Sequence, residues 1–180
     1  MENVFKARGD LRIVVRRAAD NSVQWQYEIR NMITYAGLES MVNLIAQTTA
    51  ITPLDYKVAY LGVGTGTSSP VRTQTDLVTP AMDGSVPYRL ALLDANKFLT
   101  AAPSFEMKVT ATIPATSPVD GVSLTEAGLY TYGGTTPISV TEYPAASGRY
   151  PKLFARQVHP AIVKTTALVI DYDWRISFTA

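Results

Sequence analysis

Apolar and polar residues alternate along the first thirty positions of the chain. Between residues 11 and 17, and again between residues 23 and 30, every second residue is apolar and most of the residues between them are charged or polar. A period of two is that of a strand with one buried face, and Asp20-Asn21-Ser22 between the two segments favours a turn. The pattern predicts an N-terminal β-hairpin. Its inward positions are Leu11, Ile13, Val15, Val23, Trp25, Tyr27 and Ile29.

The period changes to that of a helix from Thr34 onward. Leu38, Met41, Val42 and Ile45 recur at intervals of three and four residues, with polar residues opposite. Because proline and the residue before it resist helical geometry, we expect the helix to end before Pro53. One helix therefore follows the hairpin and packs through this apolar stripe.

The rest of the chain is predicted to form strands separated by turns. Alternation is strong over 105–113 and over 168–178, where Trp174 lies on the apolar face, and shorter strands are expected at 56–63, 87–94, 124–132 and 153–158. Such patterning is typical of antiparallel sheets with one buried face. We expect a mainly β, single-domain fold over residues 1–180, an antiparallel β-sandwich with one packed α-helix after the N-terminal hairpin.

Two irregular stretches, 64–86 and 133–152, exceed the usual loop length of about a dozen residues. The second contains Tyr143 and Tyr150, and exposed aromatic rings in an ordered loop usually need a partner surface to cover them. The first contains Pro70 and Arg72. These four residues are therefore candidates for contacts between chains, and surface loops that contact nothing are the alternative.

Composition excludes several classes of enzyme. The chain has no cysteine and one histidine, His159, which excludes thiolate nucleophiles, disulfides and metal sites made of several Cys or His residues. A serine nucleophile would have to use His159, and the chain has no G-x-S-x-G sequence. We therefore predict no catalytic residues, no metal and no cofactor.

Charge gives no reason to expect nucleic acid or a membrane as partner. The 16 Lys and Arg residues nearly balance the 15 Asp and Glu residues, so the net charge is +1. An N-terminal cluster of Arg8, Arg12, Arg16 and Arg17 is diluted by nearby aspartates and is interpreted as a solvated edge. No run approaches the length of a membrane span, and the first residues lack an apolar leader, so we expect a chain that is made and stays soluble.

Two motifs suggest ligand chemistry but have simpler explanations. Gly64-Thr65-Gly66-Thr67 follows a predicted strand, as phosphate-binding loops do, but the Lys-Ser/Thr ending of a P-loop is missing, so a glycine turn is favoured. Asp171 and Asp173 lie two apart on one strand face and could flank a sugar bond or hold Ca²⁺. With no third ligand indicated, a charged outer face is the better explanation.

Three further residues are predicted to be structural. Glu126 interrupts an apolar strand, and a buried carboxylate must find donors, either backbone N–H groups or an arginine such as Arg156. General acid catalysis by Glu126 lacks a second acid or histidine nearby in sequence. Trp25 and Trp174 both fall on the apolar phase of their strands, so core packing is expected for each.

Four segments in one order resemble a known group of proteins. They are NMITYAGL (31–38), LGVGTGTSSP (61–70), LTEAGLY (124–130) and LFARQVHPAIVKT (153–165). Together they resemble small tailed-bacteriophage virion structural proteins of the tail-fibre-like group, which carry an LGTGT loop, an EAGLF strand and an LLAR-x-x-F-P-x-I-x-K strand. The chain departs from that pattern at Gln157-Val158-His159 and in the longer segment 133–152.

The resemblance implies a non-enzymatic assembly module of the tail or of the fibre-attachment or collar region, located in the virion and made in the host cytoplasm. Its implied partners are copies of itself, in a ring or trimer, and other virion proteins. A capsid decoration protein is the alternative within this class. From other classes, a carbohydrate-binding module would use Tyr143 and Tyr150 on a host glycan, and a glycosidase would need Asp171 or Glu126 to act.

Overall fold

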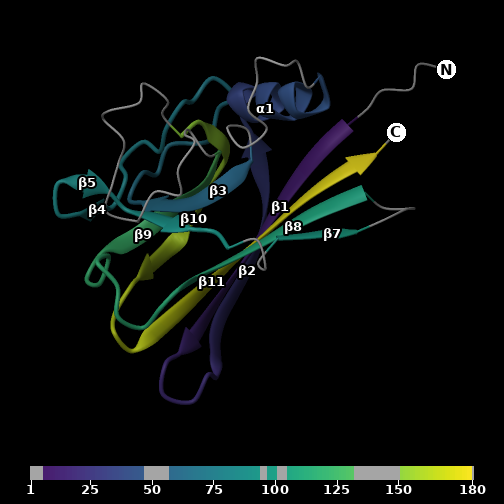
Figure 1. The fold of residues 1–180 in the computed structure, drawn as a ribbon. Helices are drawn as coiled ribbons and strands as arrows, with labels where there is room; N and C mark the ends of the chain where they lie inside the picture. Colours follow the sequence, from purple (N-terminus) through teal and green to yellow (C-terminus); the bar gives the residue numbers. More distant parts are fainter. Residues whose placement is uncertain (1–5, 47–56, 94–96, 101–104, 132–150, 180) are drawn as a thin grey trace.

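The described part of the fold is one large antiparallel sheet, a small ribbon and one helix (Figure 1). The computed structural model describes residues 6–46, 57–93, 97–100, 105–131 and 151–179. The helix is α1 (Tyr35–Ala46). The strands are β1 (Lys6–Arg17), β2 (Val23–Ile33), β3 (Val58–Gly64), β4 (Met82–Asp83), β5 (Val86–Pro87), β6 (Arg89–Ala91), β7 (Lys97–Thr100), β8 (Phe105–Ile113), β9 (Ser123–Thr131), β10 (Leu153–Val163) and β11 (Leu168–Thr179).

Nine strands form the main sheet in the order β6-β3-β9-β10-β2-β1-β11-β8-β7, and β4 pairs with β5 separately. The sheet curls into a nearly closed, barrel-like form. The mainly β class, with a helix directly after an N-terminal hairpin, is confirmed for the described residues. The two halves of the sheet are joined through β2, which pairs with β1 on one side and, through Met32 and Ile33 alone, with β10 on the other.

The apolar faces predicted for β1, β8 and β11 form the core. Their inward residues are almost completely buried, and Trp174 on β11 has no exposed surface. The core cluster from these three strands contains Leu11, Ile13, Val15, Val109, Ala111, Ile113, Ile170, Tyr172, Trp174 and Ile176. The period-two pattern was therefore a reliable guide to the buried face of these strands.

The prediction that Val23 and Trp25 point into the core is wrong, since they are 58% and 51% exposed. The register between β1 and β2 shifts at Val15/Arg16, which places Val23 opposite Arg16 on the outward face. Trp25 stays opposite the buried Val15. It lies toward the turn of the β1–β2 hairpin, where no described strand pairs with the second edge of β2, and its ring is only half covered.

The helix begins at a cap that also fastens it to β10. The Thr34 hydroxyl accepts a hydrogen bond from the Gly37 N–H (3.1 Å) and donates to the Leu153 carbonyl. A Cβ at Gly37 would lie 2.2 Å from the Phe154 carbonyl oxygen, so only glycine allows this close approach. Because the contact turns Gly37 and Ser40 inward, Val42 is 62% exposed, contrary to the predicted stripe.

The two long irregular segments differ in how far the structure describes them. The segment 64–86 is ordered, with a bridge between Gly64 and Pro80 and the strand β4, whereas most of 133–152 lies outside the described residues. The edge strand β7 was not predicted, because four residues are too few to show a period. No helix in the described ranges is long and apolar enough to span a membrane.

Candidate functional site

Glu126 on β9 is the centre of a buried polar cluster under the loop 64–80. Its side chain has no exposed surface. One carboxylate oxygen, Oε1, accepts hydrogen bonds from the N–H groups of Gly66 (3.0 Å) and Thr79 (2.8 Å). The other, Oε2, accepts from the Val78 N–H (3.1 Å) and from Arg156 Nε (2.7 Å). The donors that the sequence analysis required for this carboxylate are therefore present, and Arg156 is among them.

Arg156 extends the cluster further along the same loop. It lies on β10 directly opposite Gly128 of β9, and its side chain is fully buried. Its Nη1 donates to the Ser68 carbonyl (3.0 Å) and to Gln74 Oε1 (3.1 Å). One ion pair in the sheet therefore holds the loop 64–80 at three places. Glu126 binds the loop near its two ends, and Arg156 binds its middle.

The environment of Glu126 favours the ionised carboxylate. Burial alone would raise its pKa, but the Thr79 N–H, the Arg156 guanidinium and the Val78 N–H together hold the pKa below its ordinary value. The group is therefore a permanent anion at neutral pH. An acid held in this form is unsuited to donate a proton in catalysis, and it serves as an acceptor that fixes the loop.

The glycines of the LGVGTGT segment are explained by this carboxylate. A Cβ at Gly66 would lie 2.5 Å from Glu126 Oε1, and a Cβ at Gly64 would lie 2.3 Å from the Thr79 carbonyl oxygen. The loop does cradle an anion with its backbone N–H groups, but the anion is the protein's own glutamate. The expectation of a glycine turn is thus consistent with the geometry, and the donors of Gly66, Val78 and Thr79 already have a partner.

A second polar anchor holds the loop at Asp76, through Tyr130 of β9. The Tyr130 hydroxyl donates to Asp76 Oδ1, and Arg89 Nη2 donates to the same oxygen (2.8 Å). The Arg89 guanidinium also lies 3.9 Å from the centre of the Tyr130 ring. Sequence reasoning missed this anchor. The only signal was that Tyr130 and Glu126 share one face of a strand, which by itself names neither Asp76 nor Arg89 as partner.

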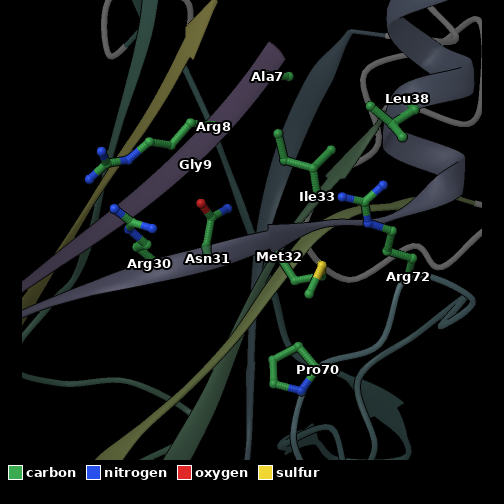
Figure 2. A pocket seen from close by; sticks show the side chains of 10 residues that line it. All are labelled: Ala7, Arg8, Gly9, Arg30, Asn31, Met32, Ile33, Leu38, Pro70 and Arg72. Atoms are coloured by element: carbon green, nitrogen blue, oxygen red, sulfur yellow. The ribbon is translucent and has the colours of Figure 1, made fainter.

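A solvent-accessible pocket of about 710 Å³ opens beside the loop. Pro70 and Arg72 line it from the loop, so the structure brings two of the four candidate interface residues to one place (Figure 2). The other lining residues come from β1, β2 and α1: Ala7, Arg8, Gly9, Arg30, Asn31, Met32, Ile33 and Leu38. Tyr143 and Tyr150, the other two candidates, lie outside the described residues.

The pocket is basic and contains an amide without a partner. Arg8 donates to Asp10 Oδ1, while the side chains of Arg30 and Arg72 have no hydrogen-bond or ion-pair partner among the described residues. The side-chain nitrogen and oxygen of Asn31 are buried, and neither has a hydrogen-bond partner within the described structure. Guanidinium groups next to apolar surface from Met32 and Pro70 suit a carboxylate-bearing protein segment.

The remaining candidates have partners within the fold. Asp171 forms a two-pronged ion pair with Arg16 (Nε–Oδ2 2.7 Å, Nη2–Oδ1 2.9 Å), and Asp173 accepts from the Thr110 hydroxyl (2.8 Å). His159 is buried and donates from Nδ1 to the Pro160 carbonyl (2.9 Å). The described residues contain no group of three or more His, Asp or Glu side chains placed to hold a metal ion.

The site thus consists of an internal clamp, Glu126–Arg156, and an accessible basic pocket beside the clamped loop. Comparison of the chain with protein-family models, with characterised proteins and with solved structures finds no match.

Proposed function

We propose that the chain is a structural protein of a bacteriophage virion, an assembly module of the tail or of the fibre-attachment or collar region. It works through contacts with copies of itself and with neighbouring virion proteins. In this proposal the module is a β-sandwich whose two layers are the two halves of the curled sheet.

The observation that supports the proposal is that three of the four motif segments meet in one cluster and the fourth packs beside it. The LTEAGLY strand supplies Glu126, the LFARQVHPAIVKT strand supplies Arg156, and the LGVGTGTSSP loop supplies the Gly66 N–H that Glu126 binds. The helix start adds Gly37, packed on the Phe154 carbonyl. Three of the segments that carry the resemblance therefore fix a long loop against the sheet, and the fourth packs the helix on the strand that supplies Arg156.

Fixing that loop prepares a surface for a partner. A loop that is already ordered loses little conformational entropy on binding. Here the ordered loop presents Pro70 and Arg72 at the edge of the basic pocket, and its backbone is also tied to α1 through the Tyr35 N–H and the Arg72 carbonyl (2.8 Å). An acidic segment of a neighbouring virion protein is the partner that this charge favours.

Labelling of purified particles tests the virion assignment directly. An antibody against the chain, visualised by electron microscopy, is expected to mark the tail or the collar. Labelling of the capsid surface would instead identify a decoration protein. Absence of the chain from purified particles would contradict the virion role altogether.

A charge reversal tests the pocket. Arg72→Glu is expected to reduce incorporation of the chain into particles by about tenfold or more, because an acidic partner would then meet a like charge. Arg175→Glu is the control, since Arg175 is a half-exposed arginine on β11 outside the pocket whose ion pair with Glu106 is long (3.9 Å). Equal incorporation of both variants would remove the pocket from the proposal, and equal melting temperatures would show that folding is unaffected.

A further inference from the structure

One side of β2 is unpaired over most of its length. β1 covers one edge of β2 from Asn31 to Val23. On the other edge, β10 pairs only with Met32 and Ile33. Among the described residues no strand pairs with the second edge from Val23 to Asn31. Along this nine-residue stretch every second residue directs its backbone N–H and C=O groups to the free edge, where a further strand could bind them.

The sequence of β10 explains why the sheet divides at this point. Pro160 has no N–H to donate, and the register of β10 against β9 shifts between Val158 and Ile162. Both features interrupt the regular hydrogen bonding of β10 beyond Val158. Toward the hairpin turn β2 is therefore paired with β1 only, while β1 remains paired with β11 on its other side (Figure 1).

The free edge of β2 carries little of the usual protection against pairing. Natural edge strands are kept short or carry proline, charged side chains, lysine above all, or bulges. The two terminal strands of the sheet follow this rule, since β6 has 3 residues and β7 has 4. The stretch VQWQYEIRN of β2 contains no proline or lysine. Its protection is limited to a bulge at Gln24 and to two opposite charges, Glu28 and Arg30, and beyond the bulge the strand is regular.

This weakly protected edge also lies beside exposed apolar surface. Trp25 is 51% exposed on the face that it shares with Val15. Tyr27 and Ile29 follow on the same face and are only partly buried. An added strand would cover these side chains and the backbone together, which is the usual basis of strand addition at a sheet edge.

We propose that β2 pairs antiparallel with β2 of a second copy of this chain. The sequence of the edge is complementary to itself: with Tyr27 at the two-fold axis, Trp25 of each copy lies opposite Ile29 of the other. Gln26 then lies opposite Glu28, so no like charges face each other. Such a contact is isologous and closes as a dimer. The inference does not depend on the virion role, because it is tested on the purified chain alone.

Sedimentation velocity of the purified full-length chain tests the pairing. We expect a dimer at about 100 µM, dissociating on dilution. Trp25→Lys is expected to raise the dissociation constant at least about tenfold, because the variant sets a charge against Ile29 of the second copy. Val42→Lys is the matched control, since Val42 is 62% exposed on the helix and should leave the dimer intact. A wild-type chain that stays monomeric at this concentration overturns the proposal.

Disulfide trapping tests the register independently. The chain has no cysteine, so a single introduced cysteine reports one position only. Tyr27→Cys should give a covalent dimer on oxidation, because directly opposed residues in antiparallel strands bring their Cβ atoms within about 4.5–5.5 Å. Ala19→Cys, in the hairpin turn, should not. Crosslinking of both variants, or of Ala19→Cys alone, would show that the copies associate through another surface. Melting curves of both variants check that each is folded.

Discussion

At the scale of single residues, the acids and bases of this chain are used to hold backbone in place. Glu126 accepts four hydrogen bonds from backbone and Arg156, and Lys164 donates to the carbonyls of Ala115 and Thr165 and to Asp120. Both side chains are fully buried. A charge removed from water is stable only when it is paired and hydrogen-bonded, so each one fixes the segment that supplies its partners.

Removing the Glu126 carboxylate is expected to destabilise the fold strongly. Glu126→Ala leaves the buried Arg156 guanidinium without its counter-ion and should cost about 3–5 kcal/mol of unfolding free energy. Glu126→Gln keeps one accepting oxygen and the side-chain volume, so it should cost less. Urea unfolding of the three proteins measures the order. Equal tolerance of both substitutions would mean that the clamp contributes little to stability.

Acid is expected to weaken the fold in two separate pH ranges. Burial lowers the pKa of His159, opposed only in part by the Pro160 carbonyl and Glu126, so the unfolded chain binds this proton first and stability should fall as pH drops below about 6.5. Glu126 has a lowered pKa when folded, so its contribution is present above about 4.5 and is lost below that value. Urea unfolding across pH should show both ranges. His159→Gln should remove the first, since the chain has no other histidine.

At the scale of elements, periodicity was informative where one face of a strand is covered along its whole length. It located β8 at its observed bounds and gave the inward face of β11. It was misleading in β2, because the register shift at Val15/Arg16 and the unpaired second edge near the hairpin turn are set by pairing between strands. The pattern of a single strand contains no information about which neighbouring strands cover it. Trp25 and Trp174 therefore both fall on the apolar phase of their strands, but Trp25 is half exposed and Trp174 is fully buried.

These two tryptophans should respond differently to truncation. Trp174→Ala removes a fully buried ring from the middle of β11 and is expected to cost about 3–5 kcal/mol. Trp25→Ala removes a half-exposed ring and should cost about 1 kcal/mol or less in the monomer. Thermal melting at low protein concentration measures both. Similar losses for the two variants would show that Trp25 is packed against more of the core than its exposure indicates.

The junction between helix and sheet depends on one missing side chain. Gly37→Ala would place a methyl group 2.2 Å from the Phe154 carbonyl oxygen, which is too close for a carbon atom. The helix α1 must therefore move away from β10. We expect a loss of about 1–3 kcal/mol, although alanine is the better helix former. Ala36→Gly is the control for helix propensity, since Ala36 is only partly buried. If Gly37→Ala is neutral or stabilising in urea unfolding, the close approach is not a constraint.

At the scale of the whole molecule, the clamp joins parts of the chain that are far apart in sequence. Residues 66 and 156 meet through residue 126, and Asp76 meets Tyr130 and Arg89. The chemistry of this site was predictable in part, because a carboxylate in an apolar strand requires donors and Arg156 was a named candidate. The basic pocket was not predictable, since it depends on how the loop, the hairpin and the helix come together around Asn31.

The same connections predict that the loop 64–80 does not open independently of the sheet. The N–H groups of Gly66, Val78 and Thr79 bind a buried carboxylate, so their amide hydrogens should exchange with solvent as slowly as those of β9 and β11. Hydrogen exchange measured by NMR on the native protein tests this. In Glu126→Gln these amides should exchange faster than the core strands, because the loop has lost part of its anchor while the sheet remains folded. Fast exchange in the wild type would contradict a loop held ready for a partner, whereas slow exchange would show that unfolding of the loop requires unfolding of the sheet.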